Sequence, residues 1–132
     1  MKLGALLVAA GLAAAAWTGE SDLLSRVPQA SAAQPNPLEN NREAERAGAK
    51  LFARECAACH GPDREGRGKA PRLDCSAVHQ AAPGKLFWIL RNGSLGYGMP
   101  SFAHLPETER WQIVTFLRSP AAPHPGASGP GR

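Results

Sequence analysis

The chain has 132 residues and a mass of 13.9 kDa, with 20% charged residues and a formal net charge of +4. This length allows one small domain with tails and excludes a two-domain enzyme with a cleft between lobes. Seven of the 12 prolines precede Leu38 or follow Arg118, so residues 38–118 are expected to form the folding unit. At this size one apolar core gives marginal stability, and a disulfide, metal or covalent cofactor is expected to support it.

The N-terminus has the pattern of an export signal. Lys2 precedes an uncharged apolar run over residues 3–17, and the next charge is Glu20. The run is shorter than the roughly 17 to 25 residues of most membrane spans. Residues 1–17 are therefore predicted to be a signal peptide, with an N-terminal membrane anchor as the alternative, and the protein to be periplasmic in either case.

The next segments alternate between polar and helical patterns. Residues 18–37 are rich in Ser, Ala, Gln and Pro, which predicts a flexible linker. From Asn41 onwards, apolar residues recur with helical spacing through Phe52, so a helix is expected to run up to Cys56. Repeated Gly and Pro residues after His60 then predict a loop.

Two more helices are expected in the second half of the chain. A short apolar helix begins at Pro83 and ends at Asn92 and Gly93, and the last helix begins near Pro106 and runs to Arg118. Residues 119–132 are rich in Pro, Gly and Ala and are predicted to be a disordered tail. The prediction is an all-α fold of about three helices joined by long loops.

The sequence Cys56-Ala57-Ala58-Cys59-His60 is a c-type haem attachment signature. Cysteines three residues apart at a helix end lie on one turn, so both thiols can form thioethers with the vinyl groups on one edge of a porphyrin. The adjacent imidazole can then bind the iron. We therefore predict one covalently attached haem c, with Cys56, Cys59 and His60 as its attachment and ligand residues.

Met99 is the predicted second axial ligand. It is the only methionine besides the initiator residue, and it lies in a loop shaped by Gly96, Gly98 and Pro100. Such a loop can bring the thioether to the second haem face, and a Met/His pair raises the reduction potential relative to two histidines. His79 and His104 are the competing candidates for this position.

The chain resembles the class I (mitochondrial-type) c cytochromes over most of residues 38–118, and the small bacterial monohaem domains in particular. The resemblance rests on Gly48 and Phe52 facing a C-terminal helix that contains Trp111, and on Gly98-Met99-Pro100. It implies the cytochrome c fold, with long loops wrapped around one haem. It also implies that Pro71 offers its carbonyl oxygen to the second nitrogen of the proximal histidine, which fixes the ring orientation.

Two features fall outside this pattern. Cys75 is a third cysteine, and with Cys56, Cys59 and His79 it gives a spacing close to that of a Cys3His zinc site. Five basic residues around the motif can either attract an acidic partner or an anionic membrane surface, or simply form a solvated face: Arg54, Arg64, Arg67, Lys69 and Arg72. No nucleic-acid-binding module is visible.

The function predicted from these residues is electron transfer by a periplasmic monohaem cytochrome with His/Met-ligated iron. Its partners would be redox proteins: a dehydrogenase or respiratory complex as donor, and an oxidase or other acceptor. The protein is then an electron carrier and not an enzyme. The alternatives are a haem protein with an open iron position and peroxidase-like or ligand-sensing activity, and the zinc-binding module.

Overall fold

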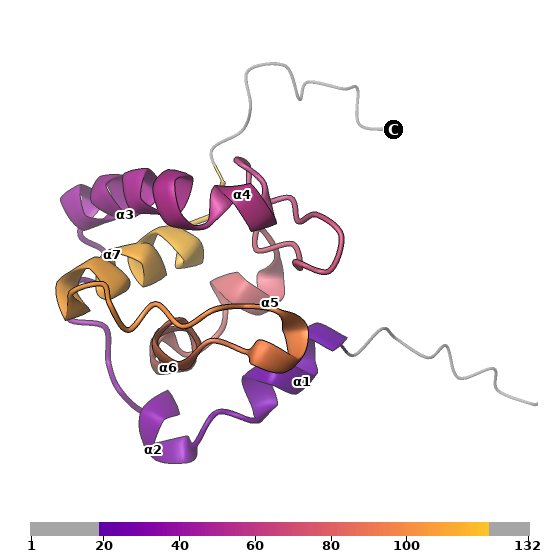
Figure 1. Cartoon of the computed structure of the whole chain (residues 1–132). Coiled ribbons are helices and arrows are strands. Elements are labelled where there is room, and N and C mark those ends of the chain that lie inside the picture. Colours follow the sequence, from indigo (N-terminus) through magenta and orange to yellow (C-terminus); the bar gives the residue numbers. More distant parts are fainter. Residues whose placement is uncertain (1–18, 122–132) are drawn as a thin grey trace, which may run out of the picture.

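The computed structural model describes residues 19–121, which form a bundle of helices joined by loops (Figure 1). Within this range the only β-type pairing consists of two isolated bridges. No helix in the described range is long and apolar enough to cross a membrane. The predicted signal peptide or anchor (residues 1–17) and most of the predicted tail (residues 122–132) lie outside the described residues. In chain order the helices are α1 (Gly19–Ser25), α2 (Gln29–Ala32), α3 (Arg42–Glu55), α4 (Ala57–His60), α5 (Ser76–His79), α6 (Pro83–Asn92), the 3-10 helix η1 (Leu95–Tyr97) and α7 (Glu107–Arg118).

Helices α3 and α7 pack directly against each other and form the frame of the fold (Figure 1). Helix α3 begins at Asn41, whose side chain accepts hydrogen bonds from the backbone N–H groups of Glu43 and Ala44. Gly48 faces α7 so closely that a Cβ atom there would lie 2.0 Å from the carbonyl oxygen of Gln112. This confirms the predicted close approach of the first long helix to the C-terminal helix.

Helix α6 covers the opposite side of α7. The ring of Phe87 on α6 stacks on Trp111 of α7, with the two centroids 3.9 Å apart. Trp111 and Phe52 are almost completely buried, as are Ile113 and Val114. The three long helices predicted from the sequence are therefore present, and their apolar faces meet in one core.

The segment before α3 differs from the flexible linker predicted for residues 18–37. It contains α1 and α2, and α2 packs against the start of α6, where Gly84 lies directly beneath the carbonyl oxygen of Ser31. Asn36 is buried, and its side-chain amide donates to the hydroxyl of Thr115 on α7 at 2.9 Å. The linker interpretation is wrong for residues 19–37, because a polar composition does not prevent backbone and amide groups from docking on a core.

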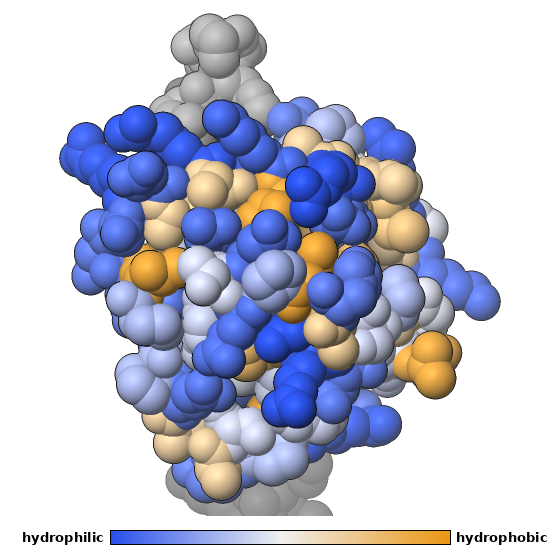
Figure 2. All heavy atoms as spheres, turned by 60° about the vertical axis from the view of Figure 1, so that its left-hand side comes forward, coloured by the Kyte–Doolittle hydropathy of each residue, from blue (hydrophilic) through white to orange (hydrophobic). Residues whose placement is uncertain are grey.

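The outer surface is largely hydrophilic, with small scattered apolar areas on the face that Figure 2 shows. Among the described residues, the large apolar side chains that are clearly exposed are Leu95, which is 86% exposed, and Tyr97, which is 49% exposed. Both belong to η1, in the loop that leads to Met99. These two side chains therefore form an apolar protrusion in the loop that leads to Met99.

Candidate functional site

The two motif cysteines and His60 lie on one short helical turn directly after α3. Cys56 is the residue between α3 and α4, and its carbonyl oxygen accepts from the N–H groups of Cys59 (3.1 Å) and His60 (2.9 Å). The Cys56 side chain is buried in the core, whereas Cys59 is exposed, so the two sulfurs face different surroundings on the same turn. Burial, helped by the charges of Glu55 and Cys59, raises the pKa of the Cys56 thiol to about 12, which keeps this buried sulfur uncharged at neutral pH.

The ring of His60 is held by the loop that follows it. Its Nδ1 atom lies 2.9 Å from the carbonyl oxygen of Pro71, which is the contact that the sequence resemblance implies. Because a carbonyl oxygen can only accept, the proton of a neutral ring is on Nδ1, and Nε2 keeps its lone pair for a metal ion. This arrangement is typical of a histidine ligand oriented by a second hydrogen bond.

The loop between His60 and Pro71 turns back on itself through backbone contacts. The N–H of Gly66 donates to the carbonyl oxygen of His60 at 2.7 Å, and the N–H groups of Arg67 and Ala70 each donate to the other residue's carbonyl oxygen. Gly66 has a φ of 83°, and a Cβ atom there would lie 2.7 Å from the backbone nitrogen of Arg72. A glycine at this position therefore allows the chain to reverse and bring Pro71 under the histidine.

Met99 lies in a second loop, between α6 and α7. Its backbone pairs with that of Ser94, since each N–H donates to the other residue's carbonyl oxygen, at 2.9 and 3.1 Å. Gly98 before it is left-handed, with a φ of 79°. The Met99 side chain is partly buried against the apolar core, which also contains Cys56, Leu90 and Phe102.

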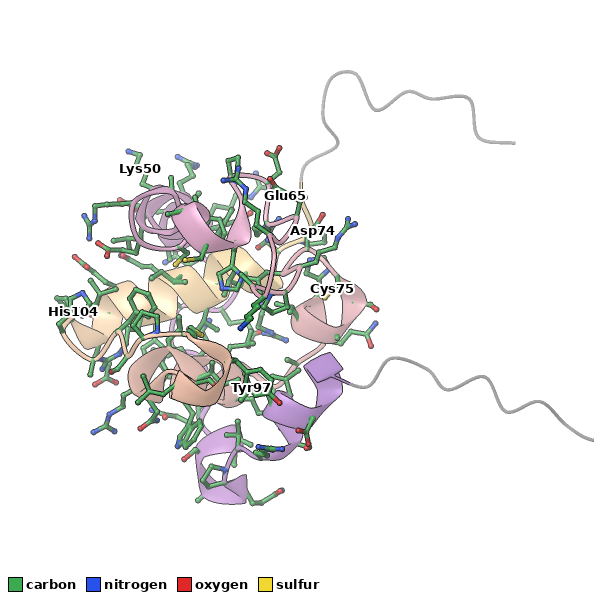
Figure 3. The ribbon with its side chains drawn as sticks, turned by 45° about the vertical axis from the view of Figure 1, so that its right-hand side comes forward. Lys50, Glu65, Asp74, Cys75, Tyr97 and His104 are labelled. Atoms are coloured by element: carbon green, nitrogen blue, oxygen red, sulfur yellow. The ribbon has the colours of Figure 1, made fainter. Side chains whose placement is uncertain are left out.

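The competing histidines have other surroundings. His79, at the end of α5, lies with its Nε2 atom 3.1 Å from a carboxylate oxygen of Asp74. His104 is exposed, and it lies on the opposite side of the molecule from Asp74 and Cys75 (Figure 3). No group of three or more His, Cys, Asp or Glu side chains is placed to hold a metal ion in the part of the chain that the structure covers.

The basic cluster around the motif divides into exposed and buried members. Arg67 and Arg72 are exposed, with side chains 56% and 63% accessible. Arg64 is only 3% exposed and points at the end of α7, so it does not belong to a solvated or partner-steering surface. The sequence does not predict this burial, because charged residues are seldom fully buried. The groups that Arg64 contacts lie at the end of a helix 52 to 55 residues later in the chain.

The structure also contains a polar surface cavity of about 400 Å³. It is lined by polar side chains from the segment before α3, the start of α3 and the end of α7: Asn36, Glu39, Asn40, Arg42, Glu45, Thr115, Arg118 and Ser119. Arg118 forms an ion pair with Glu39 across it. None of the predicted haem-attachment residues lines this cavity.

The residues on the Cys56–His60 turn fit a covalently bound haem. They combine two thiols and an imidazole on one turn, and the His60 ring already has the tautomer that leaves Nε2 for iron. Cys56 and Met99 both contact the apolar core, which is the dry environment that a porphyrin requires. Met99, the candidate second ligand, lies on a separate loop between α6 and α7.

Comparisons with known proteins identify the family of the chain. Residues 43–117 match the protein family described as "Cytochrome C oxidase, cbb3-type, subunit III". No curated protein matches the chain.

The solved structures that are similar to the chain include three c-type cytochromes. Cytochrome cL from the marine methylotrophic bacterium Methylophaga aminisulfidivorans MPT is 27% identical, with a TM-score of 0.55 over 64% of this chain and 57% of that one. The c-type cytochrome XoxG from Methylobacterium extorquens AM1 is 26% identical, with a TM-score of 0.50 over 57% of this chain and 48% of that one. Cytochrome cL from Hyphomicrobium denitrificans shares the fold at 18% identity, with a TM-score of 0.53 over 74% of this chain and 65% of that one. The chain thus spans less than two thirds of each of these proteins.

Proposed function

We propose a specific electron-transfer function for this chain, which belongs to the cytochrome c family described as cytochrome c oxidase, cbb3-type, subunit III. The predicted all-α cytochrome c fold is confirmed, and membership of the family implies covalently bound haem c. Its relatives are cytochromes, and cytochromes carry electrons. The proposal adds which residues hold the haem, how the iron is ligated, and where the carrier works.

In this proposal Cys56 and Cys59 form the two thioethers, and Nε2 of His60 binds the iron. The observation that carries it is the bond between His60 Nδ1 and the Pro71 carbonyl oxygen, beside two cysteines on the same turn. Haem supplies the one-electron chemistry, since its iron alternates between the ferric and ferrous states. The chain's own residues hold the group, set the direction of the imidazole and exclude water from it.

Met99 is proposed as the second axial ligand. Its loop is closed by the paired backbones of Ser94 and Met99, and the side chain packs against the core from the side of α6. When haem is bound, a thioether from Met99 would fill the remaining coordination position and leave none open for a substrate. This is what distinguishes a carrier from a peroxidase-like or ligand-sensing haem protein.

We propose that the protein works in the periplasm with redox proteins as partners, accepting electrons from a dehydrogenase or respiratory complex and passing them to an oxidase or other acceptor. The apolar protrusion formed by Leu95 and Tyr97 lies next to Met99 in sequence, and Arg67, Lys69 and Arg72 are exposed on the loop after His60. Exposed cations favour transient docking on an acidic surface, and exposed apolar side chains can add contact area to it. High salt should then slow electron exchange with such a partner.

The first test is chemical. The protein, expressed with its leader in a host that matures c cytochromes, is analysed by pyridine haemochrome spectrum and for zinc. One covalently attached haem per chain supports the proposal, whereas zinc without haem overturns it and favours the Cys3His alternative.

The second test concerns Met99. The ferrous wild-type protein should resist carbon monoxide, and Met99→Ala should bind it rapidly and with one molecule per haem. His104→Ala, which removes the exposed competing histidine, is the matched control and should behave as the wild type if Met99 is the ligand. Rapid stoichiometric binding by the wild type contradicts the carrier mechanism and favours the open-site alternative.

A further inference from the structure

Arg64 is a buried cation in the middle of the loop between His60 and Pro71. Only 3% of the residue is exposed, and its backbone has a φ of 60°, which side-chain-bearing residues seldom adopt. A residue in this conformation and environment is held there by its contacts. The contacts of Arg64 run in two directions, one from its side chain and one from its backbone.

The side chain is fixed to the C-terminal end of α7. Its Nη1 atom donates to the carbonyl oxygens of Phe116 (3.0 Å) and Ser119 (2.9 Å), and it lies 3.4 Å from that of Leu117. The last carbonyl groups of a helix have no partner within the helix and carry partial negative charge, so a guanidinium satisfies them and interacts favourably with the helix dipole. The guanidinium also lies over the ring of Phe116, 4.5 Å from its centroid.

Nearby carboxylates offset the positive charge of the buried Arg64 guanidinium only in part. Burial lowers the pKa of Arg64, and the carboxylates of Asp74 and Glu45 act in the opposite direction. The Nη2 atom of Arg64 lies 3.9 Å from Oδ1 of Asp74, which is a weak ion pair. The helix carbonyls are therefore the main partners of this cation.

The backbone of Arg64 holds the far end of the same loop. Its carbonyl oxygen accepts from the N–H groups of Leu73 (2.9 Å) and Asp74 (3.2 Å), the residues that come just after Pro71 and Arg72. The backbone N–H of Arg64 donates to the carbonyl oxygen of Gly61 at 3.1 Å. One residue therefore joins the start of the loop, its return next to Pro71, and the end of α7.

We propose that Arg64 is a positioning residue: it fixes to α7 the loop whose Pro71 carbonyl orients His60, and through that bond it sets the reduction potential. This rests on the proposed function, because it requires His60 to be the ligand of a bound haem. A hydrogen bond from Nδ1 makes the imidazole a stronger donor to iron and favours the ferric state. Loosening the loop weakens this bond and raises the potential.

A purely electrostatic role makes the opposite prediction. A buried positive charge near the haem favours the reduced state, so its removal lowers the potential. Arg64→Lys separates the two, because it keeps the charge but loses the planar guanidinium over the Phe116 ring, and its shorter side chain ends before the carbonyl groups that Nη1 reaches. Arg64→Met removes the charge as well.

The experiment measures two quantities on the haem-loaded protein: the reduction potential, and the hydrogen exchange rate of the His60 Nδ1 proton by NMR in the ferrous state. We expect Arg64→Lys to raise the potential and to speed exchange about fivefold or more, which is the factor for losing roughly one net hydrogen bond. Arg67→Lys, the same substitution at an exposed arginine of the same loop, keeps the charge and is the matched control, so it should change neither quantity.

Two outcomes overturn the proposal. One is an Arg64→Lys protein with wild-type potential and exchange. The other is a lower potential in Arg64→Met with unchanged exchange in both variants, which assigns Arg64 a charge effect only.

A measurement on the wild type protects the test against a variant that does not fold. The His60 Nδ1 proton and the amide protons of Leu73 and Asp74 should exchange with the same dependence on denaturant as the amide of Ser119 at the end of α7. The proposal is contradicted if the loop around His60 and Leu73 opens independently of the end of α7 at Ser119. A wild-type protein without covalent haem would instead mean that the proposed function itself has failed.

Discussion

Gly48→Ala tests the contact that frames the fold. The Cβ atom of alanine would lie 2.0 Å from the carbonyl oxygen of Gln112 and 2.9 Å from Cβ of Phe116, whereas ordinary contacts begin at 3.4 Å. The nearest obstacle is the backbone of α7, which no side-chain rotation can move. The two helices must therefore separate by about 1.4 Å, the difference between 3.4 and 2.0 Å.

The expected loss of stability is about 2 to 3 kcal/mol. Overpacking a close-packed core costs typically 1 to 3 kcal/mol and somewhat more when backbone obstructs, so we take about 3 to 4 kcal/mol here. Alanine inside a helix recovers about 1 kcal/mol relative to glycine. For a domain of this size the net value corresponds to a decrease in Tm of about 8 to 24 °C.

The assay is denaturant unfolding of the haem-loaded protein, followed by far-UV circular dichroism. Gly96→Ala is the control, because nothing lies within 4 Å of its added Cβ atom, and it should stay within about 0.5 kcal/mol of the wild type. A Gly48→Ala protein as stable as the wild type, with full haem content, would refute the inferred helix contact.

Three other substitutions probe the docked N-terminal segment and the haem. Gly84→Ala should lower stability by about 1 to 3 kcal/mol in the same unfolding assay, because a Cβ atom there would lie 2.1 Å from a carbonyl oxygen of α2. Asn36→Ala should cost about 1 to 3 kcal/mol, since it removes the buried partner of the Thr115 hydroxyl. Cys59→Ala, which removes one thioether, should leave a largely unfolded chain by circular dichroism, because a domain this small depends on its cofactor for part of its core.

Each of these has its own contrary result. Gln29→Ala, an exposed position on α2, serves as the control for the first two and should be nearly neutral. If Gly84→Ala and Asn36→Ala are equally neutral, residues 19–37 contribute nothing to folding. Native-like helical circular dichroism in Cys59→Ala would show that the apolar core is sufficient without the covalent bond.

The main features of the fold and of the candidate site follow from local sequence rules. The spacing of apolar residues in α3, α6 and α7 marks their buried faces, and Cys56, Cys59 and His60 are adjacent in sequence, so their grouping needs no knowledge of the fold. Pro71 is found through its resemblance to a family position, and the structure places its carbonyl oxygen against His60. The roles of Met99 and His60 as ligands remain predictions.

What the sequence did not predict depends on contacts between distant segments. Asn36 and Thr115 are 79 residues apart, and nothing in the composition of residues 18–37 indicates that a buried hydroxyl awaits that amide. From the sequence, Arg64 is grouped with the basic residues around the motif. Its burial depends on carbonyl groups at the end of a helix 52 to 55 residues later. Polar residues buried by such long-range pairing have no periodic signature.

The docked N-terminal segment changes how far this domain can reach from a membrane. A free linker over residues 18–37 would extend to about 66 to 72 Å, at about 3.3 to 3.6 Å per residue. The folded body instead begins at Gly19, directly after the apolar run that ends at Trp17. If that run is retained as an anchor, the available tether is only roughly 7 Å long. The cytochrome would then stay close to the surface of the bilayer, and cleavage of the run would release it to diffuse.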